Sequence, residues 1–185
     1  MSVLAKTILL ERLRDTTDFF VTPILDENQI GPSSIDIRLH KEFIIFRKSQ
    51  RESVNLHISD KAAWRVALHE FQERVRFSFN DQFVLHPGEL VLGGSLEYIS
   101  LPTNVFATVE GKSTLGRLGL IIATATSISP GFKGCITLEI VNEGEIPIVV
   151  KPGQLIGQLV FWETKGEGAY DGKYLHPIGP QYAVI

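Results

Sequence analysis

The sequence predicts a mainly β protein, either a barrel or a jelly roll, with about two helices on its surface. From residue 77 to residue 161, short runs keep the period of two that is typical of strands with one buried face. Glycine or proline interrupts these runs roughly every ten residues. Three Pro-Gly pairs, which begin at Pro87, Pro130 and Pro152, are expected to form turns. A chain of 185 residues fits a single domain over residues 1–185.

Two segments with helical spacing lie in the first half of the chain. Residues 2–14 are expected to form a helix that Ser2 caps. Its apolar residues near one face are Leu4, Ile8 and Leu13. A second helix is expected from Ser59 to about Arg74, because apolar residues recur there at helical intervals. These residues are Trp64, Leu68, Phe71 and Val75.

Outside these two segments, alternating apolar and polar residues predict a series of strands. Residues 35–39 alternate apolar and polar side chains after the turn residues 31–34. Later residues that alternate in the same way are Phe77 and Phe79, Phe83 and Leu85, Leu96 and Tyr98, and Val105, Ala107 and Val109. After Trp162 the sequence is rich in glycine and polar residues, so residues 162–185 are expected to form a mobile tail.

The composition argues against several classes of protein. A net charge of -3 provides no basic surface of the kind that binds nucleic acid. No stretch approaches the roughly 18 apolar residues of a membrane helix. The single cysteine, Cys135, leaves no internal disulfide, and a cytoplasmic location is therefore expected. The histidines lack HxH or HExxH spacing, so neither zinc nor another protein-bound metal is expected.

Glu139 is the first candidate for chemistry. Alternation over residues 136–141 places it on the face opposite Leu138, with apolar neighbours on both sides. A carboxylate in such surroundings suits a general base or a proton shuttle. The alternative is a glutamate on the solvated face of a sheet, and the alternation alone favours this plainer interpretation.

The second candidate is the segment 109–120, which reads VEGKSTLGRLGL. Its Gly-Lys-Ser run is similar to the end of a P-loop, but Phe106 stands where that motif requires its first glycine. The segment still carries a group of hydrogen-bond donors: Lys112, Ser113, Thr114 and Arg117. Such groups suit phosphate oxygens. The alternative is a polar hairpin turn without a ligand.

Long parts of the chain resemble the dCTP deaminase family within the deaminase and dUTPase superfamily. The resemblance covers FVLHPGELVLGGSLEYISLPTNVFATVEGKSTLGRLGL and PGFKGCITLEIVNEGEIPIVVKPGQLIGQLVFWE. The upstream GPSSIDIRL is similar to an early strand motif of the family, and YDGKY in the tail is similar to its C-terminal lid. The resemblance implies a distorted β-barrel of the jelly-roll type, as in dUTPases, and a homotrimer with sites at the subunit interfaces.

The same resemblance implies an activity and assigns roles to residues. Water would replace the amino group on C4 of the cytosine in dCTP, giving dUTP and ammonia, with Mg²⁺ carried by the triphosphate and without zinc. Glu139 would be the general base, and Arg117 would orient the water and Glu139. The substrate-binding residues would be Lys112, Ser113, Thr114, Gln158, Lys173 and Tyr174 for the phosphates, and Ala125 and Ser129 for the nucleoside. Residues 162–185 would contain a lid that closes over the ligand.

Two departures from the family pattern keep alternatives open. Ser129 occupies the position of an aspartate that helps to activate water in dUTP-hydrolysing relatives, and the loop before it is one residue shorter than usual. A dUTP diphosphatase is therefore the less expected activity. In the lid, Leu175, His176 and Pro177 follow Tyr174 where the family often has a glutamine. The alternative from another class is a non-catalytic nucleotide-binding or regulatory paralogue, which Ser129 and the shorter loop favour. Retention of both Glu139 and Arg117 favours an enzyme, whose nucleotide ligands would include dCTP, with dUTP or dTTP as further candidates.

Overall fold

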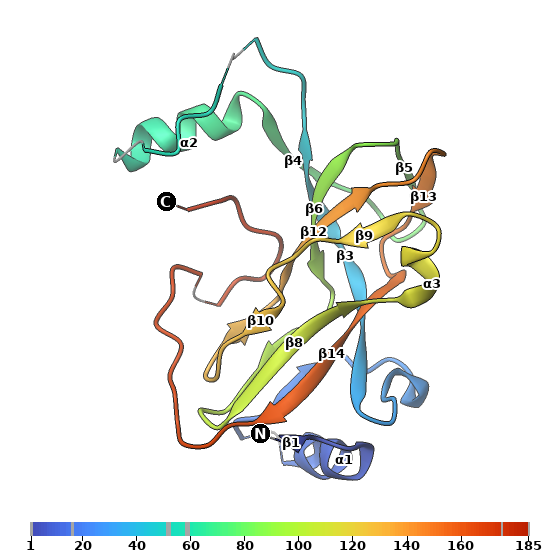
Figure 1. Cartoon of the computed structure of the whole chain (residues 1–185), viewed down its shortest axis with the longest axis vertical. Helices are drawn as coiled ribbons and strands as arrows, with labels where there is room; N and C mark the ends of the chain where they lie inside the picture. Colours follow the sequence, from blue (N-terminus) through green and yellow to red (C-terminus); the bar gives the residue numbers. More distant parts are fainter. Residues whose placement is uncertain (1, 16, 51–52, 58–59, 175, 185) are drawn as a thin grey trace.

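The computed structural model describes residues 2–15, 17–50, 53–57, 60–174 and 176–184. Its main sheet is curled and antiparallel (Figure 1). Its strands, in pairing order, are β10 (Ser127–Ile128), β8 (Val105–Gly111), β14 (Leu155–Glu163), β3 (Ser34–Phe46), β6 (Leu90–Ser95), β12 (Thr137–Asn142) and β9 (Leu120–Ile122). In addition, β1 (Ser2–Val3) pairs with β14, and β4 (Gln72–Arg76) pairs with β3. The predicted fold class, mainly β with a curled sheet, is confirmed.

Two smaller antiparallel sheets complete the β structure. One consists of β11 (Lys133–Gly134), β7 (Tyr98–Ser100) and β2 (Phe20–Thr22), and the other of β13 (Ile148–Val150) and β5 (Phe83–Leu85). The long strand β3 links the two halves of the main sheet, because its first half pairs with β14 and its second half with β4 and β6. The predicted strand 35–39 lies in β3, where Ile35, Ile37 and Leu39 are fully buried.

The first helix is shorter than predicted. Ser2 does not cap it, because Ser2 belongs to β1 and pairs with Glu163 of β14. The helix α1 spans Lys6–Arg14 and starts after Ala5, which makes no side-chain capping bond. This later start changes the buried face, so that Leu9 is fully buried whereas Ile8 is 40% exposed.

The second helix also ends earlier than predicted. The helix α2 spans Lys61–His69, and the side chain of Asp60 caps it by accepting a hydrogen bond from the Ala62 amide at 2.8 Å. The predicted start at residue 59 lies outside the described residues. The predicted continuation to Arg74 is wrong, because residues 72–76 form β4 and pair with Phe46 and its neighbours in β3. Pairing with an existing strand outweighs the helical spacing there.

The remaining strands agree with the sequence in most places. The predicted strand at Phe77 and Phe79 is wrong, since β4 ends at Arg76. Leu96 also lies outside a strand, between β6 and β7, while the amide of Leu96 donates to the Arg38 carbonyl at 2.7 Å. A further short helix, α3 (Ser113–Gly116), connects β8 to β9. A 3-10 turn covers Glu27–Gln29.

The C-terminal tail follows the outside of the sheet. After β14 ends at Glu163, the chain runs along one side of the molecule and finishes beside α2 (Figure 1). Pro177, Gly179 and Pro180 are buried against the body of the protein. The role of the tail as a mobile lid stays a prediction. Among the described residues, no helix has the length and apolar character needed to cross a membrane.

Candidate functional site

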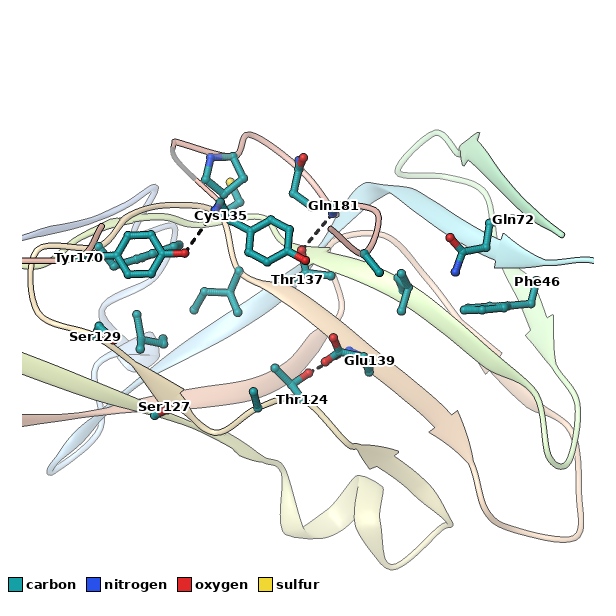
Figure 2. Close-up of a pocket in the computed structure, with 18 residues that line it drawn as sticks. Phe46, Gln72, Thr124, Ser127, Ser129, Cys135, Thr137, Glu139, Tyr170 and Gln181 are labelled. Carbon is teal, nitrogen blue, oxygen red and sulfur yellow. Dashed lines mark hydrogen bonds between the residues drawn. The ribbon is translucent and has the colours of Figure 1, made fainter. Parts of the chain in front are cut away.

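A cavity of about 410 Å³ lies between β12, the segment before and including β10, and the C-terminal tail (Figure 2). Gln72 and Phe46 lie toward one end, Tyr170 and Ser129 lie toward the other, and Glu139 lies between them. The body of the protein also contributes Leu92, Thr124, Ala125, Ser127, Ile128, Phe132, Cys135, Ile136 and Thr137. The tail also contributes Tyr174, Pro177, Gln181 and Ala183. The cavity is therefore roofed by the tail.

Glu139 projects from β12 into the wall of this cavity. As predicted, it lies on the face opposite Leu138, which is fully buried. The Glu139 amide donates to Thr124 Oγ1 at 2.8 Å, and its carbonyl accepts from the Ala123 amide at 2.8 Å. These bonds hold the backbone on either side of the carboxylate. The alternative of an open solvated sheet face does not fit a residue that lines a cavity.

One oxygen of the Glu139 carboxylate is available to accept a hydrogen bond. Its Oε2 atom is buried and has no hydrogen-bond partner among the described residues. Buried polar atoms normally have a partner, and leaving one unpaired costs about 1–3 kcal/mol. Such an atom at a cavity wall can accept a proton or a hydrogen bond from a ligand, which is the requirement for a general base.

The rest of the cavity suits a flat molecule with polar edges. Phe132 and Tyr170 meet edge to face, with ring centroids 5.5 Å apart, and Ile128 and Ile136 add apolar surface. Hydroxyl groups enter the lining from Thr124, Ser127, Ser129 and Thr137. Apolar walls with a few polar groups are typical of small-molecule sites.

Only part of the predicted site lines this cavity. Glu139, Ala125, Ser129 and Tyr174 all do. Lys173 is exposed beside it, with Nζ 3.4 Å from the Val184 carbonyl.

The other predicted phosphate-binding residues, which are not in the tail, form a second group. Lys112 makes an ion pair with Asp36 at 2.5 Å. Gln158 accepts a hydrogen bond from Ser34 and donates one to Glu110, both at 3.2 Å. Asp36, Gln158 and Glu110 are register partners across β3, β14 and β8. Nearby, the exposed residues of α3 and its C-cap are Ser113, Thr114 and Arg117.

The two groups lie apart within one chain. The helix α3 is on the opposite side of the molecule from the tail (Figure 1), and neither Lys112 nor Arg117 lines the cavity. In the part of the chain that the structure describes, Arg117 and Glu139 share no hydrogen bond or ion pair. Their joint role in catalysis stays a prediction.

Several residues of the cavity were not predicted from the sequence. Gln72 is 6% exposed and lines the cavity, and its buried Oε1 atom has no partner within the part of the chain that the structure describes. The helix predicted over residues 59–74 hid this position, because β4 aims Gln72 inward only once it pairs with Phe46. Thr124 carries no local signal, since its role depends on a bond to a strand that lies later in the chain.

Other reactive groups in this region are poor candidates. Burial raises the pKa of the Cys135 thiol to about 11, so the thiolate is scarce at neutral pH. Within the described residues, no group of three or more histidine, cysteine, aspartate or glutamate side chains is placed to hold a metal ion.

Comparison with known proteins identifies the family. A family model described as dCTP deaminase-like matches residues 3–164. The chain belongs to the dCTP deaminase-like family. The family member named dCTP deaminase in Halorubrum lacusprofundi is 35% identical over 191 residues, which cover 99% of this chain and 91% of that protein. A member from Methanobrevibacter smithii, named dCTP deaminase, dUMP-forming, is 34% identical over 189 residues, which cover 98% of this chain and 94% of that protein.

The fold agrees with a solved member of the dCTP deaminase-like family. The crystal structure of 2'-deoxycytidine 5'-triphosphate deaminase from Agrobacterium tumefaciens matches 86% of this chain with a TM-score of 0.65 and 25% sequence identity. The match spans 48% of that longer chain, or about half of it. The resemblance inferred from the sequence motifs is thus confirmed at the level of family and fold.

Proposed function

We propose that this protein is a hydrolase that deaminates dCTP to dUTP and ammonia. The observation that carries the proposal is Glu139, whose buried and unpartnered Oε2 lies in the wall of a cavity of suitable size, in a chain of the dCTP deaminase-like family. Cytosine presents a C4 amino group that water can replace. A carboxylate beside that carbon can take a proton from the water and return it to the leaving group.

The chemistry balances without a further reactant. Glu139 removes a proton from water, and the water oxygen forms a bond to C4. Glu139 delivers this proton to the ring nitrogen N3, which keeps it. The new C4 hydroxyl then gives up its proton, which Glu139 passes to the amino group, and the C4–N bond breaks as the C4 carbonyl forms. Ammonia leaves with dUTP as the other product. General acid-base help of this kind contributes about 10²–10⁴-fold to the rate. The Thr124 bond fixes the backbone of Glu139, which favours one position of the carboxylate.

We infer that the complete site forms between copies of the chain. The separation of the Glu139 cavity from α3 and Lys112 supports this, because one chain does not bring the predicted catalytic and phosphate-binding groups together. In the homotrimer that the family resemblance implies, a neighbouring copy would present Arg117 toward Glu139 and would offer the donors for the triphosphate: Lys112, Ser113, Thr114 and Gln158. Lys173 and Tyr174 would approach from the tail. Mg²⁺ would arrive bound to the triphosphate.

Ser129 favours dUTP over dUMP as the final product. The relatives carry both names, dCTP deaminase and dCTP deaminase, dUMP-forming. Release of dUMP needs a second water to be activated against the α-phosphate. Ser129 lines the cavity where the resemblance places an aspartate, and a serine hydroxyl is a much weaker proton acceptor than a carboxylate. We therefore expect the triphosphate to survive the reaction.

The test is to incubate the purified protein with dCTP, dUTP, CTP or dCMP in the presence of Mg²⁺ and to separate the products. Ammonia and dUTP in equal amounts from dCTP are expected, with no pyrophosphate. Binding of dCTP without any product would instead support a nucleotide-binding protein without turnover. Pyrophosphate from dUTP would establish diphosphatase activity. Light scattering tests for the trimer, and we expect the protein in the cytoplasm.

A further inference from the structure

The end of the tail crosses the sheet directly over the Glu139 cavity. The Pro177 carbonyl accepts a hydrogen bond from the Cys135 amide at 2.7 Å, and the Gln181 amide donates to Thr137 Oγ1 at 3.0 Å. Thr137 and Glu139 are on the same face of β12 (Figure 2). The tail is thus tied to the strand that carries the proposed catalytic residue.

Two glycines provide the surface on which the tail rests. A Cβ atom on Gly94 would come within 3.0 Å of Pro180 Cδ, and one on Gly134 within 2.3 Å of Pro177 Cδ. The distance at Gly134 leaves no room for a side chain, and the distance at Gly94 would allow one only if Pro180 shifted slightly. The two prolines therefore pack directly on the backbone of the body. Close contact of this kind requires the tail to be held in register along β6 and β11.

Arg74 makes contacts that can hold this register. Its Nη2 donates to the Pro180 carbonyl at 2.8 Å, and its Nη1 bonds to Glu42 Oε2 at 3.1 Å. The same guanidinium lies over the Tyr182 ring, 5.3 Å from its centroid. Arg74 therefore joins two residues of the tail to an acidic residue of β3.

The helix α2 adds a second attachment next to the first. Trp64 Nε1 donates to the Ala183 carbonyl at 2.8 Å. His69 meets Tyr182 edge to face, with ring centroids 5.0 Å apart. These contacts give a use to a helix that lies on the outside of the sheet and whose function the family motifs do not explain.

We propose that Arg74 is a positioning residue that holds the C-terminal tail as the roof of the Glu139 cavity, with Trp64 of α2 as the second attachment. Its effect on dCTP turnover depends on the proposed function, but its effect on the tail does not. With the roof in place, the unpartnered oxygens of Glu139 and Gln72 are shielded from water. Ligand groups that donate to them replace the lost hydration, so binding of the ligand and docking of the tail reinforce each other.

Hydrogen exchange of the Cys135 amide tests the attachment without any nucleotide. This amide bonds to the tail through Pro177, so its exchange rate reports how often the tail opens. In Arg74→Ala, loss of a charged hydrogen bond and of the ring contact is expected to speed its exchange roughly tenfold. Arg76→Ala is the matched control, because Arg76 is exposed on the same face of β4, and it is expected to leave the rate unchanged.

Further variants separate a specific attachment from general loosening. Arg74→Lys is expected to restore part of the protection, since lysine keeps the charge but lacks the planar fork that serves Glu42 and Pro180 together. Trp64→Phe removes only the N–H donor and is expected to speed exchange about threefold. Amides within β8 and β14 are expected to keep their rates in all four variants. Equal exchange at Cys135 in the wild type and in Arg74→Ala, or equal acceleration in Arg74→Ala and Arg76→Ala, would overturn the proposal.

Turnover gives a separate readout. In Arg74→Ala the KM for dCTP is expected to rise about threefold with a smaller change in kcat, because an open tail reduces the fraction of protein that can bind. If the wild type releases no ammonia, the proposed function fails while the exchange result at Cys135 still decides the role of Arg74. If exchange is unaffected while dCTP is turned over normally, the attachment fails and the proposed function stands.

Discussion

Two carboxylates of this protein are withdrawn from solvent in different ways. Glu97 is fully buried, and both of its oxygens are bonded. Oε2 accepts from the Arg38 amide at 2.8 Å, while Oε1 accepts from Gln29 Nε2 at 2.9 Å and lies 3.3 Å from Arg38 Nη1. Glu139 has one buried oxygen that finds no partner among the described residues, and it faces a cavity. Both carboxylate oxygens of Glu97 thus have partners within the protein, whereas one oxygen of Glu139 does not among the described residues.

The difference separates a structural role from a functional one. The hydrogen bonds of Glu97 connect the chain between β6 and β7 to β3 and to the 3-10 turn. These bonds stabilise the fold. The unused oxygen of Glu139 costs stability, and a ligand in the cavity would supply the missing partner. Substitution of Glu97 is therefore expected to lower stability, and substitution of Glu139 to lower activity.

The largest expected effect is on stability. Glu97→Ala leaves the Arg38 side chain and Gln29 without their shared partner, and is expected to lower the free energy of unfolding by about 3–5 kcal/mol. Glu139→Ala is expected to change it by less than about 1 kcal/mol, because no side-chain bond is lost. Denaturant unfolding of both variants measures the difference. Similar losses at the two positions would remove the distinction.

A smaller effect, on nucleotide affinity, is expected at the predicted phosphate-binding residue Lys112. Lys112→Ala removes a cation proposed to bind the triphosphate, and is expected to weaken dCTP binding about tenfold. Affinity for deoxycytidine, which has no phosphate, is expected to stay the same. Lys151→Ala, which removes an equal charge from an exposed position, serves as the control. Normal dCTP affinity in Lys112→Ala would contradict the phosphate assignment.

The smallest effect concerns pH. Burial raises the pKa of Glu97 above its ordinary value of 4.5, despite its bonds to Arg38. The folded protein therefore binds this proton more readily than the unfolded chain does. The contribution of Glu97 to stability is greatest below pH 4.5 and declines as the pH rises through the folded-state pKa.

Unfolding of the wild type and of Glu97→Gln across this pH range checks the sign. The stability of the wild type relative to the variant is expected to fall from pH 4.5 toward neutrality. A relative stability that rises over the same range would show that the pKa is lowered instead.

The parts that local pattern predicted well are the strands of the sheet and the face of Glu139. Alternation in residues 35–39 and 136–141 reflects one buried and one open side, and the structure keeps both. Local pattern predicted the wrong secondary structure where pairing with a strand distant in sequence determines it. Val75 fits a helix by spacing, but pairing with β3 makes it part of a strand. Ser2 looks like a helix cap until β14 is beside it.

For the candidate site, too, some residues could be predicted from the sequence and others could not. Family motifs were sufficient to select Glu139, Ala125, Ser129 and Tyr174, all of which line one cavity. The motifs did not indicate that Lys112 and Arg117 lie away from this cavity within one chain, because spacing along the sequence does not encode distances in the folded chain. The role of Gln72 and the attachment of the tail by Arg74 depend on contacts between segments far apart in the sequence. Such contacts become visible only in the folded chain.

The central claim is that Glu139 keeps an oxygen free in order to move a proton between water and the base. Ammonia release from dCTP by Glu139→Gln tests it most directly, with dCTP binding and unfolding measured on the same sample. The expected result is a loss of at least about 10²-fold in turnover, with the nucleotide still bound and the fold intact. Turnover equal to that of the wild type would contradict the claim.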